Sequence, residues 1–279
     1  MIIDSLQGIV KKNKGVNDLF LRNLLKESLQ LYTLNFIYTS VYAERLLFKG
    51  GACLRFCFGL PRLSEDLDFD IKNISQFSLK KFTNSLQDYF VKKLQYKNLT
   101  VKVAGNKKQI FLKFPLMEKL GLRADRSESN ILFLRIDLSP VDSSIFKEEI
   151  SLKANDDFNF IIKRYSLPDL FASKIAAVLQ RTFHKGRKDL ITFKGRDYFD
   201  LIWFLERGTP PNLERLKDIL KIQKCGKILE LLDDKVKMVK EEYLKEDLLP
   251  LFQDKDFVEN FTRNFKTLYQ QKREVLNIE

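Results

Sequence analysis

The stretch FKGGACLRFCFGLPRLSEDLDFDI, residues 48–71, decides the fold. It places the glycine pair Gly50-Gly51 directly after Lys49, and from Asp66 onward its acidic and apolar residues alternate. Successive side chains of a strand point to opposite faces, so Asp66 and Asp68 are expected to share one face. Two carboxylates so close repel each other unless a cation lies between them, and hard divalent cations take carboxylate oxygens as ligands. The alternation therefore indicates a metal site.

The glycine pair supplies the second half of this hypothesis. Glycine lets the backbone approach a phosphate closely, and the first N–H groups of a following helix can bind that phosphate. Each half alone has an ordinary alternative: Asp-x-Asp can be a solvated strand face, and Gly-Gly can be a turn. Their combination in a fixed order is more specific.

That combination resembles a known signature. Gly-Gly, then fourteen residues, then Asp-Leu-Asp resembles the nucleotidyltransferase signature of the DNA polymerase β-like superfamily. Within it, KGGACLRF and GLPRLSEDLDFD resemble the bacterial AbiEii/AbiGii-type toxin family, whose members share Lys-Gly-Gly-(small)-x-Leu-Arg followed by Arg-x-Ser-x-Asp-hydrophobic-Asp-Phe. Ala52 stands where threonine is common in the family, which removes a hydroxyl and keeps the backbone site. The resemblance spans residues 47–207.

Composition limits the partners and the compartment. The 279 residues carry a formal charge of +12, which favours a polyanion such as nucleic acid or an anionic membrane surface, although lysine-rich solubility is an alternative. The three cysteines, Cys53, Cys57 and Cys225, lack metal-site spacing and favour a reducing compartment. No long apolar run precedes Lys11, so we expect no signal peptide, and the longest uncharged stretch, residues 28–43, is too short and polar for a membrane span. We therefore expect a cytoplasmic protein.

A second strand supplies a further carboxylate. The sequence ILFLRIDLS, residues 131–139, predicts a strand, and residues 99–103 and 109–114 predict a hairpin. Asp137 is unexpected in so apolar a strand, because an unpaired buried carboxylate is costly. A third metal-facing carboxylate would explain it, and the resemblance implies one in this region. An ion pair with Arg135 or an exposed edge is the alternative.

Helices dominate the rest of the prediction. Residues 17–47 and 77–94 are predicted helical, and a loose domain boundary is expected after residue 155, giving domains 1–155 and 156–279. Residues 166–182 predict a helix capped by Ser166, with Lys174 inside its apolar stripe. That lysine either snorkels to water or points into an anion site, and the resemblance matches it to a lysine of the family's second conserved helix.

A further helix is predicted over residues 197–206. Its GRDYFDL segment resembles the family's Arg-Asp-x-x-Asp-Leu motif, and the alternative for Asp197 is a helix N-cap. Between the two helices, residues 183–196 look loop-like and basic. His184 is the only histidine of the chain and gives weak support for acid–base chemistry. Residues 212–279 have the pattern of charged helices without a motif.

Together these features predict an α/β (α+β) protein, a nucleotidyltransferase fold with a small mixed sheet and a helical C-terminal half. The resemblance implies transfer of a nucleoside monophosphate from an NTP to an acceptor hydroxyl, with two Mg²⁺ ions, or Mn²⁺ in their place. It also implies a toxin with a separate antitoxin, in a toxin–antitoxin or phage-defence system, and a tRNA 3′ end as acceptor. Nucleotidylation of a protein or small molecule, or non-catalytic nucleic-acid binding on the same fold, are the alternatives.

The expected roles fall into three groups. The metal ligands are Asp66, Asp68 and Asp137, and the other catalytic residues are Lys174 and Asp197. The triphosphate would be held by the backbone of Gly50 and Gly51, by Ser64, and by Lys49 or Arg55. Lys174→Met is expected to keep stability and to lose NTP binding. A basic segment would guide RNA, through Arg181, Lys185, Arg187, Lys188 and Arg196, although a solvated loop would also account for it.

Overall fold

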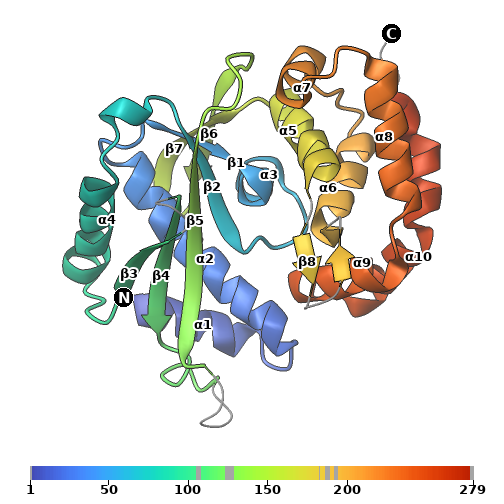
Figure 1. Cartoon of the computed structure of the whole chain (residues 1–279). Helices are drawn as coiled ribbons and strands as arrows, with labels where there is room; N and C mark the ends of the chain where they lie inside the picture. The colour runs from blue at the N-terminus through green and yellow to red at the C-terminus, as the bar shows by residue number, and fades with distance from the viewer. Residues whose placement is uncertain are drawn as a thin grey trace. The chain divides into compact units, whose positions relative to one another are not determined.

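The computed structural model describes residues 2–104, 108–122, 129–181, 183–185, 189–191 and 194–276. The chain forms two compact units (Figure 1). The first comprises residues 1–141 and 150–164, and the second comprises residues 142–149 and 165–279.

The first unit is built on a seven-stranded mixed sheet of order β3-β4-β5-β2-β1-β7-β6. β2 runs parallel to β5 and antiparallel to β1, whereas β3, β4 and β5 form antiparallel neighbours. This arrangement confirms the α/β fold with a mixed sheet and the hairpin predicted after residue 99. The strands are β1 Leu46–Lys49, β2 Asp66–Ile71, β3 Thr100–Ala104, β4 Gln109–Pro115, β5 Ile131–Pro140, β6 Glu148–Ala154 and β7 Asn159–Tyr165.

The helices that begin at Asp18 and Leu79 start close to the predicted positions, whereas the helix that begins at Ile2 was not predicted. Asn17 caps α2, because its side chain accepts a hydrogen bond of 2.9 Å from the backbone N–H of Leu19. However, α2 ends at Tyr38 rather than at residue 47, because residues 46–49 pair with β2 as a strand. The elements are α1 Ile2–Lys12, α2 Asp18–Tyr38, α3 Gly50–Phe58, a 3₁₀ turn Ile74–Gln76, α4 Leu79–Asp88 and a π-helical turn Tyr89–Lys93.

Alternation in β2 separates an apolar face of the sheet from a polar one. Leu67 and Phe69 are fully buried, and the ring of Phe69 stacks on that of Phe48 from β1 at 5.1 Å between centroids. Burying such side chains stabilises the sheet by about 2 kcal/mol each. The register of β2 is thereby fixed, since a shift by one residue would turn its carboxylates into this core.

The second unit is a set of helices with one short hairpin. Ser166 caps α5 as predicted, with its hydroxyl accepting from the N–H of Asp169 at 3.3 Å. Its elements are α5 Leu167–Gln180, β8 Phe183–Lys185, β9 Asp189–Ile191, α6 Gly195–Glu206, α7 Leu213–Leu220, α8 Cys225–Lys237, α9 Glu241–Leu248, a 3₁₀ turn Leu249–Leu251, α10 Lys255–Lys272 and a 3₁₀ turn Arg273–Leu276.

A buried arginine ties residues 142–149 to this unit. Arg215 of α7 is fully buried, and its Nη2 lies 2.6 Å from the carboxylate of Asp142 while its Nη1 donates to the carbonyl of Ile145 at 3.3 Å. By contrast, the predicted boundary after residue 155 falls between β6 and β7. The sheet explains this difference, because β7 pairs with β1 at Phe48 and Arg164 and thus holds the chain in the first unit up to residue 164.

One expectation and one alternative interpretation in the second unit are wrong. Residues 183–185 and 189–191 form an antiparallel hairpin instead of a loop. Asp197 is not an N-cap, because α6 begins at Gly195 and Lys194 occupies the cap position.

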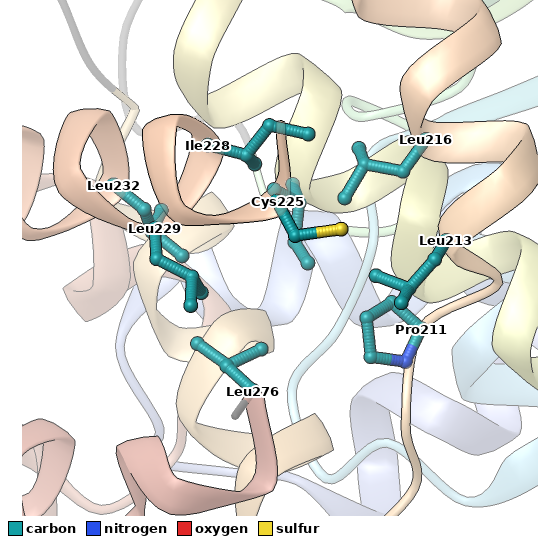
Figure 2. A pocket seen from close by; sticks show the side chains of 9 residues that line it. Pro211, Leu213, Leu216, Cys225, Ile228, Leu229, Leu232 and Leu276 are labelled. Atoms are coloured by element: carbon teal, nitrogen blue, oxygen red, sulfur yellow. The ribbon is translucent and has the colours of Figure 1, made fainter. Parts of the chain in front are cut away.

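A small apolar cavity lies among α5, α7 and α8 (Figure 2). Its volume is about 10 Å³, roughly what one water molecule needs. The side chains that line it are apolar apart from the thiol of Cys225, so a water there would lack hydrogen-bond partners. We interpret it as incomplete core packing. Its lining comprises Ile175, Pro211, Leu213, Leu216, Cys225, Ile228, Leu229, Leu232 and Leu276. Within the described ranges, no helix is long and apolar enough to cross a membrane.

Candidate active site

The polar face of the first unit gathers charged side chains from three adjacent strands. In the register of the sheet, Asp68 pairs with Asp137 of β5 on one side and with Lys49 of β1 on the other. Asp66 pairs with Arg135 in the same way. Directly paired residues of neighbouring strands share a face, so the three carboxylates predicted as metal ligands lie on one surface. We call this surface the acidic strand face, made of Lys49, Asp66, Asp68, Asp70, Arg135 and Asp137.

Arg135 is the charged neighbour of two of these carboxylates. Its Nη2 contacts the carboxylate of Asp66, and its Nε lies 3.2 Å from Oδ2 of Asp137. The side chains of Asp66 and Asp137 remain 18% and 28% exposed. The ion pair that sequence offered as the alternative explanation for Asp137 therefore forms, and it forms on the face that would hold a cation.

A buried pair lies beside the exposed carboxylates. Asp70 is fully buried, with Lys49 Nζ 2.6 Å from its Oδ1 and the hydroxyl of Ser139 donating to the same oxygen at 3.0 Å. A buried carboxylate requires such partners, because its desolvation is otherwise costly. The Lys49 ammonium is thereby held on the acidic strand face, next to the start of α3.

The glycine pair permits a close approach of backbone and side chains. Gly50 has φ +76°, and a Cβ there would lie 2.2 Å from Oδ2 of Asp68. A Cβ on Gly51 would lie 2.5 Å from Nη2 of Arg62 and 3.2 Å from the hydroxyl of Ser64. Both glycines are thus required by contacts with the signature residues themselves, which a simple turn would not demand.

Arg62 is a residue of this region that the sequence analysis did not single out. It is 1% exposed, and its Nη1 donates to the carbonyl of Leu63 at 2.9 Å. The signal was present in the Arg-x-Ser-x-Asp motif, whose first position it occupies. Because its guanidinium lies against Gly51, it fixes the turn between α3 and β2 beside the predicted phosphate site.

Arg55, by contrast, forms contacts that hold α3 in place. It binds Glu27 of α2 through Nε at 2.8 Å and Nη2 at 3.2 Å, and it donates to the carbonyls of Leu60 and Pro61, each at 3.1 Å. These contacts brace α3 against α2 and the turn after α3. Of the two cations proposed for the triphosphate, Lys49 is the one held on the acidic strand face.

The second unit contains a separate charged cluster, which we call the α5–α6 network. Lys174 Nζ lies 2.8 Å from Oδ1 of Asp197 and 2.8 Å from Oδ2 of Asp200, and Arg181 contacts the other oxygen of Asp197. Burial would raise the pKa of Asp197, but the charges of Lys174 and Arg181 outweigh it and lower the pKa to about 2. Asp197 is therefore ionised at neutral pH.

The predicted RNA-guiding residues are only partly described. Arg181 binds Asp197, and the backbone N–H of Arg196 donates to Asp247 at 3.2 Å. Lys185 ends β8. Arg187 and Lys188 lie outside the described residues.

The acidic strand face fits a divalent cation in its donor chemistry. Its six side chains comprise four carboxylates and two cations, which leaves a net charge of −2. Across the described part of the chain, no three acidic, histidine or cysteine side chains are grouped closely enough to hold an ion as placed. On this face Arg135 contacts Asp66 of the neighbouring strand and Asp137 of its own strand.

The mixed sheet, the glycine pair and the carboxylate-bearing β2 and β5 are the arrangement of a nucleotidyltransferase. The chain matches the nucleotidyl transferase AbiEii toxin family of type IV toxin–antitoxin systems over residues 34–272, and it belongs to that family. It is thus a nucleotidyltransferase toxin. No curated protein matches the chain at a significant level.

The solved structure of one nucleotidyltransferase toxin supports the fold. The structure is similar to MenT4, a nucleotidyltransferase toxin from Mycobacterium tuberculosis H37Rv, with a TM-score of 0.58 at 14% identity, covering 98% of this chain and 92% of that one. It also matches JHP933 from Helicobacter pylori, with a TM-score of 0.46 at 18% identity and coverage of 91% and 93%.

Proposed function

We propose that this toxin transfers a nucleoside monophosphate from an NTP to the 3′ hydroxyl of a tRNA, in a reaction that depends on divalent metal ions. The observation that supports this proposal most is the acidic strand face, with Asp68 and Asp137 directly paired on parallel strands. Its net charge of −2 suits a divalent cation.

Asp66, Asp68 and Asp137 are the residues that would hold two Mg²⁺ ions. When bound, such ions stabilise the charge on the attacking and leaving oxygens of a phosphoryl transfer. Asp137 would also accept the proton of the acceptor hydroxyl. The hydroxyl oxygen then bonds to the α-phosphorus, the bond from this phosphorus to the β-phosphate oxygen breaks, and pyrophosphate leaves.

The triphosphate would bind at the start of α3. The N–H groups at this end of the helix and the hydroxyl of Ser64 are donors for phosphate oxygens. Lys49 adds a positive charge from the end of β1, and Arg62 keeps the turn in place. Lys174 and Asp197 are proposed to assist NTP binding, as their match to the family motifs suggests.

The acceptor proposal rests on charge and on the family. A net charge of +12 favours a polyanion, and an unpaired RNA 3′ end presents a free hydroxyl. A separately encoded antitoxin and a cytoplasmic location are further proposals that follow from toxin–antitoxin membership. A protein or a small molecule remains the competing acceptor, and non-catalytic nucleic-acid binding the competing activity.

Incubation with labelled NTPs, Mg²⁺ and total tRNA tests the proposal directly. We expect label on tRNA, and none when Mg²⁺ is chelated or Asp68 is replaced by asparagine. Label on protein would instead identify a protein acceptor. No label with any of the four NTPs would contradict the proposed activity.

A second experiment tests the RNA-guiding segment. Replacing Lys185, Arg187 and Lys188 with glutamate should weaken tRNA modification and spare NTP binding. Each phosphate contact on a single strand should contribute roughly 0.7 log units of affinity per log unit of salt, so the variant should also have a shallower salt dependence. Unchanged tRNA affinity in the variant, or affinity insensitive to salt, would remove this segment from RNA binding.

A further inference from the structure

Arg135 contacts two of the three carboxylates that we propose as metal ligands. Its guanidinium contacts Asp66 through Nη2 and approaches Asp137 to 3.2 Å through Nε. These two aspartates belong to different strands, and they pair in register with Arg135 and Asp68. One planar cation therefore bridges β2 and β5 at the position of the proposed ligands.

We propose that Arg135 is an internal counter-cation, which holds the site together without metal and competes with free metal ions for Asp66 and Asp137. This inference rests on the proposed function. In this role Arg135 is a positioning residue, acting through the two carboxylates.

Electrostatics supports the competition. Without the guanidinium, the other five side chains of the acidic strand face are four carboxylates and Lys49, whose Nζ lies 2.6 Å from the carboxylate of Asp70. Like charges on neighbouring strand positions are destabilising, so a cation is needed between the strands. Arginine suits this task, because it stays charged and its fork binds two acceptors.

The geometry also indicates how Arg135 could release the two carboxylates to metal ions. The side chain of Arg135 is 31% exposed, so we expect that it can move off the two carboxylates when a competing anion binds. An NTP brings phosphate oxygens, which bind guanidinium well, together with its own metal ions. We therefore expect metal binding to be weak without nucleotide and to strengthen with it, so that the site fills only when substrate is present.

The inference is tested by measuring the affinity of the full chain for Mn²⁺, without nucleotide, by titration calorimetry. Arg135→Met should bind Mn²⁺ roughly tenfold more tightly than wild type, and Arg135→Lys should lie between them. Adding Asp68→Asn to Arg135→Met should abolish this binding. Arg45→Met is the matched control: Arg45 precedes the opposite end of β1 from Lys49 and donates to the carbonyl of Gln76, so its replacement should leave Mn²⁺ affinity unchanged.

Thermal unfolding gives a second readout that a merely structural arginine would not produce. In EDTA, Arg135→Met should melt below wild type, and Mn²⁺ should raise its melting temperature by more than it raises that of wild type.

The outcomes separate the inference from the proposed function. If Arg135→Met and Arg135→Lys bind Mn²⁺ no more tightly than wild type while Asp68→Asn still removes binding, Arg135 does not compete and only this inference fails. If no variant binds Mn²⁺ with or without a non-hydrolysable NTP, the metal-dependent function fails as well.

Discussion

The acidic strand face and the α5–α6 network contain the same kinds of charged side chain but differ in charge balance and burial. On the strand face, four carboxylates meet two cations, and Asp66 and Asp137 keep 18% and 28% of their side chains exposed. In the network, two carboxylates meet two cations, and Asp200 is fully buried. An unbalanced and accessible cluster can take up a further cation, whereas a balanced and buried one is already satisfied.

This difference changes what we expect of Lys174. Lys174 lies inside an apolar helical stripe, from which we expected Lys174→Met to keep stability and lose NTP binding. The structure places two carboxylates at 2.8 Å from its ammonium. Removing one partner of a buried ion pair leaves uncompensated charge, so we now expect Lys174→Met to lose stability, while its loss of NTP binding stays a prediction.

The largest effect is expected on the strand face. Asp66→Asn should lower nucleotide transfer roughly 10³-fold, about 4 kcal/mol in the barrier, because it removes a proposed metal ligand. Its melting temperature should stay within a few degrees of wild type, since the substitution reduces net negative charge. Parallel measurement of transfer rate and thermal unfolding checks both. A variant that melts far below wild type would show that Asp66 is needed for folding stability instead.

The α5–α6 network should respond in stability. Lys174→Met should lower the free energy of unfolding by about 3–5 kcal/mol, the usual result of stranding a buried charge. Urea unfolding measures this loss. Adding Asp200→Asn should recover part of it, because Asp197 then keeps Arg181 as its partner. Equal stability of wild type and Lys174→Met would show that the ion pairs of Lys174 do not stabilise the fold.

Gly50 offers a test of geometry alone. Gly50→Ala should cost about 1–3 kcal/mol of stability because of its positive φ, and it should also displace the Asp68 carboxylate, which lies 2.2 Å from the position of the new Cβ. Transfer should fall with it. Gly59→Ala is the matched control, since its φ is also +76° but nothing lies near its Cβ position. Equal losses of transfer in both variants would exclude the contact with Asp68 as the cause.

The smallest effect concerns pH. Asp197 has its pKa lowered from 3.8 to about 2, so it contributes stability that is present above pH 4 and is lost as pH falls toward 2. The contribution is on the order of 2 kcal/mol. The stability gap between wild type and Asp197→Asn should therefore narrow from pH 6 to pH 2, as urea unfolding at each pH can measure. A stability difference that does not change with pH would contradict an ionised Asp197 paired with Lys174 and Arg181.

Local patterns in the sequence predicted much of this molecule. The alternation after Asp66, the acid in the strand before Ser139 and the cap at Ser166 all depend on neighbouring residues, and the structure has the strands and the cap. The sequence offered the pair of Arg135 with Asp137 as an alternative, because the two residues are neighbours on one strand. It could not predict the contact of Arg135 with Asp66 or of Lys49 with Asp70, because those contacts depend on sheet register. The hairpin after Arg181 was missed for a similar reason, since its strands are only three residues each.

The most direct test of the account is the rate of labelled-nucleotide transfer by Asp68→Asn at saturating Mg²⁺, with NTP and total tRNA, set against wild type. Asp68 is the carboxylate that pairs with both Asp137 and Lys49 and lies against Gly50. The account predicts a loss of roughly 10³-fold or more in a chain that melts like wild type. Transfer within tenfold of wild type by the folded variant would contradict it, because the acidic strand face would then not be the catalytic centre.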